Sequence, residues 1–374
     1  MKKIIFKKLS DEILILFIVF SLTLTSIVWI IQAVNYLDIV TDDGHSFGVY
    51  FNYTLLSLPK IFSQLLPFIF FLSVFYIINL YEEKNQLLIY WTHGVTKIEF
   101  VNKIIKFSLF FLIIQFLLSI IVVPYANNKS RSFIRSSSLD FFPNLIKPKK
   151  FIDTVENLTI FIDSKNEEGG YENIILKDKT NINNVQTIIA QTGKVVSSDN
   201  SKILILYSGQ IIQTNSKKNT TTFNFEETQF DLSKYSSKTT MKPKIQELNT
   251  FKLLQCTKFL FNNSVGKLSL KNFNCKKSFL KNIIQELFKR IYMPIYIVLM
   301  ALTSSLLVLK SKNTPHYSIF KIIIFIICLA FIIISQILLT ISGASYLNNL
   351  LFLSFPIISY IVIYKYLNSR VKFN

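Results

Sequence analysis

Long uncharged segments alternate with charged ones along this chain. Five segments contain no Asp, Glu, Lys or Arg: 13–31, 61–80, 107–123, 291–309 and 322–364. About 20 apolar residues cross the roughly 30 Å hydrocarbon core of a bilayer as a helix. The last segment is twice that length, and small and polar residues at 342–349 predict a turn within it. The pattern predicts six membrane-spanning helices, because buried helices of a soluble core are neither so long nor so numerous.

The region between the third and fourth predicted spans has a different pattern. Short runs rich in Ile, Val, Thr and Phe alternate with turn residues at 157–163, 173–178, 185–191, 202–214 and 222–232. Such spacing is typical of a β-sandwich or a jelly-roll-like sheet. Apolar residues at helical spacing predict flanking helices over 249–262 and 270–290, the second running into span four.

The predicted fold is therefore an α-helical integral membrane protein with six transmembrane helices, arranged 3+3 around an inserted periplasmic β-jelly-roll domain. Its parts are residues 1–123 with spans one to three, 124–288 with the outer domain and a β core at about 150–245, and 289–374 with spans four to six.

The net charge of +19 is distributed unevenly. The termini and the short loops 81–106 and 310–321 carry Lys and Arg, whereas the loops 32–59 and 342–349 have neither. This distribution follows the positive-inside rule, so we expect both termini in the cytoplasm and the long domain outside. It argues against a nucleic-acid partner, which the net charge alone suggests.

The sequence contains no recognisable catalytic or metal-binding motif. It has no phosphate-binding G-x-x-x-x-G-K-[ST], no H-E-x-x-H and no G-x-S-x-G. The histidines are scattered, and Cys256 and Cys275 allow a disulfide without requiring one. We expect a non-enzymatic protein without a catalytic residue, metal or cofactor of its own, and a partner that supplies energy for any transport.

The stretch 79–96, NLYEEKNQLLIYWTHGVT, is charged although apolar runs flank it. A helix over 80–93 places four polar or aromatic side chains on one face: Glu82, Gln86, Tyr90 and His93. Another face carries Leu87, Leu88 and Trp91. Gly94 is suited to end the helix in a left-handed conformation. The helix either anchors the turn at the membrane surface or couples the spans to a cytoplasmic motor.

This stretch and the span before it resemble the LptF/LptG (YjgP/YjgQ) permease family of the lipopolysaccharide exporter. That family has a proline-bearing second span followed by L…SEL…RA.G.S, and the matching positions here are Pro59, Pro67, Leu80, Gly94 and Thr96. A second match opens span four in ELFKRIYMP, at Glu286, Arg290 and Pro294. WIIQAVNYLDIV after span one is more similar to LptF than to LptG.

The resemblance implies a permease subunit of an ATP-driven exporter, or ABC transporter, in the bacterial inner membrane. It implies an LptG-like permease partner, two copies of a cytoplasmic LptB-like ATPase that holds ATP and Mg, and an LptC-like jelly-roll bridge protein. The ATPase-coupling helix falls at about 81–94, with contact residues Glu82, Glu83, Gln86, Leu87, Tyr90, His93 and Gly94.

Three positions depart from the family pattern. The family's coupling glutamate falls at Gln86 and the following arginine at Trp91, so the usual charged contacts with the ATPase are replaced. The basic residues that the family places near the outer end of span one have no counterpart at 29–36.

Candidate substrate-path residues are the polar Gln32 and Lys60 and the apolar Ile160, Ile162, Leu204 and Leu206 of the outer domain. The apolar four either line a lipid path or fill the core of the sheet. Lys60 either meets a lipid phosphate or extends its ammonium to the interface. Two other functions remain open: a permease for another envelope lipid or lipoprotein, and a membrane-anchored scaffold that transports nothing.

Overall fold

The computed structural model describes residues 2–41, 45–136, 148–153, 157–166, 170–180, 184–198, 201–215, 219–232, 244–261, 269–270, 273–275 and 277–372. The chain divides into two compact units. The helical unit comprises Met1–Ile31, Ser57–Asn128 and Lys244–Asn374. The sheet unit comprises Gln32–Leu56 and Lys129–Pro243.

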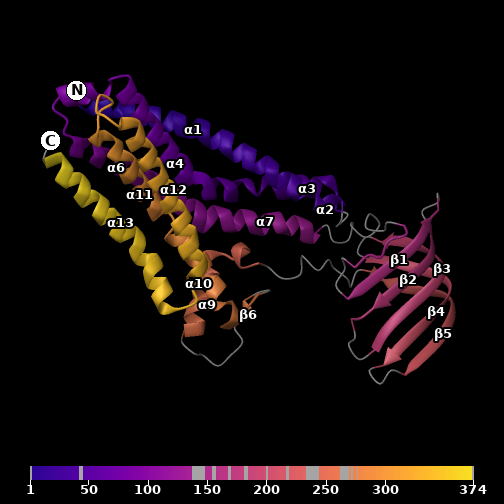
Figure 1. The fold of residues 1–374 in the computed structure, drawn as a ribbon. Coiled ribbons are helices and arrows are strands. Elements are labelled where there is room, and N and C mark those ends of the chain that lie inside the picture. The colour runs from indigo at the N-terminus through magenta and orange to yellow at the C-terminus, as the bar shows by residue number, and fades with distance from the viewer. Residues whose placement is uncertain are drawn as a thin grey trace. The chain divides into compact units, whose positions relative to one another are not determined.

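Helices form most of the helical unit (Figure 1). They are α1 (Lys2–Asn35), α4 (Leu58–Glu83), α5 (Leu87–Thr92), α6 (Lys97–Leu117), the π-helix η1 (Leu118–Val122), α7 (Val123–Ser136), η4 (Ile245–Glu247), α9 (Thr250–Phe261), η5 (Lys277–Phe279), α10 (Leu280–Ile291), α11 (Ile295–Ser305), η6 (Leu306–Leu309), α12 (Tyr317–Ile341) and α13 (Tyr346–Lys372). The last residues of α1 and α7, 32–35 and 129–136, belong to the sheet unit. Two short strands, β6 (Ser269–Leu270) and β7 (Phe273–Asn274), form a separate pair.

Helix α11 lies in the core of this unit. It packs against α4, α6, α12 and α13, and most of its side chains are buried, including Leu302 and Ser304. The hydroxyl of Ser304 donates to the carbonyl of Met300 at 2.7 Å, so burial leaves it partnered. The most interior helix is thus apolar with small residues, which allow close helix packing.

Five helical segments are long and apolar enough to cross a membrane: Lys2–Thr41, Phe47–Glu83, Lys97–Arg135, Tyr317–Ile341 and Tyr346–Val371. A sixth results if Lys277–Ile291 and Ile295–Leu309, bent by 50°, are counted as one span. The break falls at Pro294, which removes a backbone N–H. The structure thus fits an α-helical membrane protein of five to six spans.

The start of α1 and the end of α13 lie at the same end of the helical unit (Figure 1). Contacts there join segments that are distant in sequence: the Tyr364 hydroxyl donates to Asn102 Oδ1 at 3.4 Å, and Lys2 Nζ lies 3.0 Å from Glu99 Oε2. The turn predicted at 342–349 is confirmed, since Gly343 follows α12 with φ +77° and its N–H donates to Asn349 Oδ1.

The helix of span three continues beyond its uncharged run, through Pro124 to Ser136. Proline lacks the N–H that would bond to the carbonyl four residues earlier, here that of Ile120. The Thr250 hydroxyl donates to this carbonyl at 2.8 Å. The π-helix η1 immediately precedes the proline. Thr250, 130 residues away in the sequence, therefore supplies the donor for the Ile120 carbonyl where the helix continues past Pro124.

Arg290 joins α10 to the segment that enters the helical unit at 244–250. Its side chain is only 3% exposed and donates to Glu286 Oε1, to the carbonyls of Gln246 and Leu248, and to the Thr250 hydroxyl, at 2.8–3.0 Å. The Arg290 carbonyl also accepts from the Ser119 hydroxyl of η1 at 2.7 Å. The ion pair between Arg290 and Glu286 therefore belongs to a larger hydrogen-bond network.

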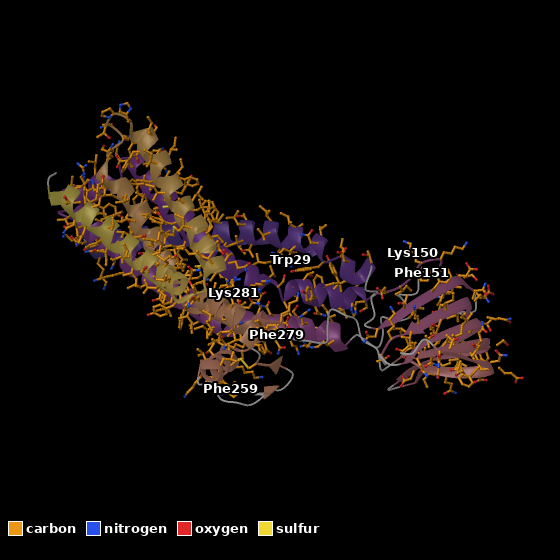
Figure 2. The ribbon with its side chains drawn as sticks, turned by 60° about the horizontal axis from the view of Figure 1, so that its bottom comes forward. Trp29, Lys150, Phe151, Phe259, Phe279 and Lys281 are labelled. Carbon is orange, nitrogen blue, oxygen red and sulfur yellow. A yellow bond between two sulfur atoms is a disulfide. The ribbon has the colours of Figure 1, made fainter. Side chains whose placement is uncertain are left out.

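The start predicted for the second flanking helix is wrong by ten residues. Residues 269–274 form the β6–β7 pair, and α10 begins at Leu280, just after Phe279; Figure 2 labels Phe279 and Lys281 there. A disulfide joins Cys275 to Cys256 of α9, with Cα atoms 5.9 Å apart. Because the disulfide ties 275 to α9, the chain turns back before it becomes helical.

The sheet unit contains five antiparallel strands in sequence order: β1 (Leu158–Lys165), β2 (Gly170–Asp178), β3 (Asn184–Ser198), β4 (Ser201–Asn215) and β5 (Thr220–Asp231). All five predicted strands are confirmed, and β3 is longer than predicted. A bridge from Ile152 to Ile160 extends the β1 edge, where the Phe151 ring, labelled in Figure 2, lies 4.7 Å from that of Phe161. The unit also holds α2 (Asp38–Thr41) and α3 (Phe47–Leu55).

One row of residues interrupts all four strand pairings without shifting their register. The skipped residues are Asp163, Asn173, Gln191, Ser208 and Glu226. Asn173 and Ser208 have φ +49°, so the backbone twists sharply at the row. The inward-facing positions change phase here: Tyr171 and Ile174 are three apart, yet both are buried in one cluster. We call this row the crease.

Gly209 lies beside the crease where neighbouring strands approach closely. A Cβ there would collide with the Ile189 carbonyl and with Ala190. We expect Gly209→Ala to lower the free energy of unfolding of the sheet unit by about 1–3 kcal/mol. Pulse proteolysis of the purified full chain in urea, read from cleavage within 148–232, measures this. Gly170→Ala is the control, since its nearest atom would be 3.8 Å away; equal midpoints for both variants would contradict the expectation.

Candidate functional site

The segment between α4 and α6 contains two successive helix endings of the same kind. Helix α4 ends at Glu83, and Asn85 takes the left-handed conformation with φ +58°. Gln86 N–H donates to the Tyr81 carbonyl at 2.7 Å, and Asn85 N–H to the Glu82 carbonyl at 3.1 Å. These two bonds define a Schellman motif, with asparagine in the place usually taken by glycine.

Helix α5 ends in the same way nine residues later. Gly94 has φ +69° and donates to the Trp91 carbonyl at 3.0 Å, while Val95 donates to the Tyr90 carbonyl at 3.0 Å. The prediction that Gly94 ends a helix in a left-handed conformation is confirmed. The prediction of one helix over 80–93 is wrong, because Asn85 breaks it.

The break changes which side chains are exposed. Leu87 and Tyr90, predicted as coupling residues, are buried in the helical core. The Tyr90 ring packs on Phe6 and Phe100, and its hydroxyl donates to the Ile5 carbonyl at 3.1 Å. Burial raises the pKa of Tyr90 to about 12, so it stays neutral at physiological pH. These two residues fix α5 to α1 and α6.

The exposed face of α5 combines His93, a predicted coupling residue, with two apolar residues that the predicted contacts did not include. Leu88 and Ile89 are about half exposed, and His93 is exposed beside them with Nδ1 2.7 Å from the Ile89 carbonyl. Asn85 is left-handed and separates α4 from α5, so the side chains after it face other directions than in one continuous helix. Its residue type was the one sign of this break in the sequence. The surface between the two Schellman motifs is therefore apolar with one imidazole; we call it the α5 surface.

The predicted carboxylates are held by the chain itself. Glu82 Oε1 accepts the Lys312 backbone N–H at 2.7 Å. Lys312 Nζ donates to the Glu83 carbonyl at 3.0 Å, and the Glu83 carboxylate lies 3.3 Å from Lys321 Nζ. Gln86 is half-buried at the start of α5. Glu82 thus ties the α4 end to the segment before α12, and Glu83 ties it to α12 itself.

The other end of the helical unit contains a polar cavity of about 360 Å³. It is lined from α4, α6, α10 and α12 and reaches Pro67, roughly 13 Å along α4 from its first residue. Four glutamines line it: Gln64, Gln115, Gln246 and Gln336.

Two lysines face the same cavity. Lys60 and Lys289 line it, and among the described residues neither ammonium has a carboxylate within 4.0 Å. Glu286 also lines the cavity, but it is paired with Arg290. Gln115 is only 4% exposed; its Nε2 donates to the Ser63 carbonyl at 2.6 Å, while its Oε1 has no partner. The cavity thus offers two cations and one free buried acceptor.

The remaining predicted path residues lie in the sheet unit. Ile160, Ile162, Leu204 and Leu206 are at most 2% exposed and pack in one cluster. Gln32 is half-buried in the last turn of α1. The structure brings the four apolar residues together on one face of the sheet, as the strand alternation predicts, and it fills that face with their side chains.

Comparison with known proteins decides the family. The family model described as lipopolysaccharide export system permease LptF/LptG matches residues 9–370. The chain belongs to this family. The match covers both halves of the helical unit and the inserted sheet, and it is shared by LptF and LptG.

A second comparison finds a similar protein. The uncharacterized protein RP871 of Rickettsia prowazekii (strain Madrid E) is 28% identical over 236 residues, which is 63% of this chain. The matched part spans 65% of that relative, slightly less than two thirds of its length. Family and apolar helices together make this LptF/LptG chain a multi-pass protein of the inner membrane.

Proposed function

We propose that this chain is the permease subunit of an ATP-driven lipopolysaccharide exporter. It extracts lipopolysaccharide from the inner membrane and passes it to a periplasmic bridge. The family match supports a role in lipopolysaccharide transport. The polar cavity beside Lys60 is the feature of this chain that supports binding of the lipid.

The cavity matches the headgroup of a phosphorylated glycolipid. Ionisable residues inside membrane segments are costly and usually functional. Lys60 and Lys289, which have no carboxylate within 4.0 Å in the described part of the chain, are suited to phosphate groups. The free Oε1 of Gln115 accepts from a sugar hydroxyl or amide N–H. These cations stand on α4 and α10, and they take the place of the basic residues missing near the end of α1.

Energy is supplied by a partner. Each CH₂ taken out of apolar surroundings costs about 0.8 kcal/mol, so extracting a lipid with several acyl chains needs ATP hydrolysis. We place an LptB-like ATPase, which holds ATP and Mg, on the α5 surface of this chain, and a second copy on the related permease partner. With Gln86 neutral and Glu82 bonded to Lys312, the contact relies on Leu88, Ile89 and His93 rather than on a carboxylate.

The sheet domain receives the lipid. We propose that it is a periplasmic jelly-roll whose inner face is the cluster of Ile160, Ile162, Leu204 and Leu206, and that an LptC-like protein continues the path. Because this cluster is filled, acyl chains enter only by parting its side chains. Both termini and α5 are then cytoplasmic, in keeping with the positive-inside rule.

The cavity is tested by replacing its two lysines together. We expect Lys60→Gln/Lys289→Gln to lower the lipopolysaccharide that co-purifies with the full chain by at least about tenfold, because two charge-assisted hydrogen bonds to phosphate are lost. Lys84→Gln/Lys365→Gln, at the opposite end of the helical unit, is the control of equal charge. Quantitative mass spectrometry of bound lipids measures both variants, and recovery of a different lipid, or equal lipopolysaccharide in all three proteins, would contradict the proposal.

A further inference from the structure

A second hollow lies between the first turns of α1 and α6, at the opposite end of the helical unit from the Lys60 cavity. Its volume is about 450 Å³. Six polar or charged side chains and two apolar ones line it, and the charged ones are Lys2, Glu99, Lys103 and Lys106. The proposed transport function does not use this hollow.

The charges in the hollow leave two cations free. Lys2 Nζ lies 3.0 Å from Glu99 Oε2 and donates to the Gly94 carbonyl at 2.9 Å, so this pair neutralises itself. Lys103 lies over the Phe6 ring at 5.8 Å, and among the described residues neither Lys103 nor Lys106 has a carboxylate within 4.0 Å. An excess of two positive charges therefore faces the space.

The position of these two cations along α6 suits contact with lipid phosphates. Lys103 and Lys106 stand roughly 9 and 14 Å along α6 from its first residue. Lys106 is the last charged residue before the uncharged run that starts at Phe107. Lysines at such a border extend their ammonium groups to the headgroup layer.

The same face of α6 continues as an apolar stripe. Residues 103, 106, 110, 113 and 117 follow one another at steps of three and four, which places them on one helix face. Phe110, Ile113 and Leu117 are each about half exposed. This face therefore complements an anionic lipid. Its two lysines match the phosphate, and its exposed apolar side chains match an acyl chain.

We propose that this hollow binds the phosphate of an anionic phospholipid through Lys103 and Lys106, with one acyl chain lying along Phe110, Ile113 and Leu117. The Asn102 amide and the Thr96 hydroxyl, which line the same hollow, supply further polar contacts for the glycerol headgroup. The lipid lies in the leaflet at the end of the bundle that carries the α5 surface. Thr96, which lines the hollow, is two residues after Gly94. It packs on α1 and α6, the helices that hold Tyr90 in place.

The test is native mass spectrometry of the full chain in detergent, titrated with phosphatidylglycerol, with phosphatidylcholine and with inorganic phosphate. We expect one retained phosphatidylglycerol, weaker phosphatidylcholine binding, and no displacement by millimolar phosphate. In Lys103→Gln/Lys106→Gln the phosphatidylglycerol affinity is expected to fall by about 30-fold, from roughly a fivefold contribution of each lysine near an anionic lipid surface.

The matched control is Lys3→Gln/Lys7→Gln. It removes the same charge from exposed positions of α1 that do not line the hollow, and it is expected to change the affinity by less than about threefold. Equal losses in the two double variants would show a diffuse charge effect and overturn the site. Displacement by inorganic phosphate, or no loss in Lys103→Gln/Lys106→Gln, would overturn it as well. Phe110→Ala/Ile113→Ala tests the acyl stripe and is expected to shorten lipid retention without changing the preference for phosphatidylglycerol.

Discussion

Replacing Arg290 by methionine is expected to lower the free energy of unfolding by about 3–5 kcal/mol, because it leaves the Glu286 carboxylate, on a side chain only 12% exposed, without its partner. The carbonyls of Gln246 and Leu248 lose their donor at the same time. Thermal unfolding of the purified chain in detergent measures the loss. Proteolysis should become faster at 244–250, since Arg290 holds that segment to α10.

Two further variants separate the network from simple packing. Arg290→Met/Glu286→Gln is expected to recover part of the stability, because no buried charge then remains unpaired. Lys289→Met, one residue earlier, is expected to change stability by less than about 1 kcal/mol, since its ammonium has no carboxylate partner among the described residues. A cost below 1 kcal/mol for Arg290→Met, or a double variant no better than the single one, would show that the network contributes little.

Gly94→Pro is expected to abolish stable capture of the ATPase. Proline fixes φ near −65°, whereas Gly94 has φ +69°, and proline cannot donate to the Trp91 carbonyl. The second Schellman motif is then lost, and α5 no longer presents Leu88 and Ile89 between two fixed turns. A gentle detergent pull-down of the tagged chain, with the captured proteins identified by mass spectrometry, measures the result.

The chain itself provides the control for this substitution. Asn85 takes the same conformation at the same position of the preceding motif, so Gly94→Asn is expected to keep the turn and most of the ATPase. A second six-span permease and a P-loop ATPase should be recovered with the wild type and with Gly94→Asn. Capture of the ATPase by Gly94→Pro at the wild-type level would remove α5 from the coupling contact, and capture of no ATPase by the wild type would favour a scaffold.

The main features of the fold were predictable because they depend on local pattern. Uncharged runs of about 20 residues are required of helices that cross lipid. Alternating runs rich in β-branched residues are typical of strands in a half-buried sheet. The strand bounds fell within a few residues for β1, β2 and β5, and the turn at Gly343 followed from its small and polar residues.

The errors occur where a distant residue or an unusual backbone decides the outcome. Helix α7 continues past Pro124 because Thr250 supplies the missing donor, and α10 starts late because Cys275 is tied to Cys256. Local sequence does not reveal Thr250 as a partner, and it allows the disulfide without requiring it. At the candidate site, Gly94 was found from its residue type, whereas the break at Asn85 was not, because asparagine is left-handed far less often than glycine.

The crease divides the five-stranded sheet into two parts, which we call leaves. Each of the five strands crosses it with one residue that takes no part in the ladder, while complete ladders lie on both sides. Two leaves joined in this way meet at an angle without the loss of a strand pairing on either side. The buried side chains on both leaves belong to one cluster, so this single angle sets how much room the cluster encloses. The packing of the domain interior is thus linked to the geometry of one row of residues, although every strand keeps its neighbours.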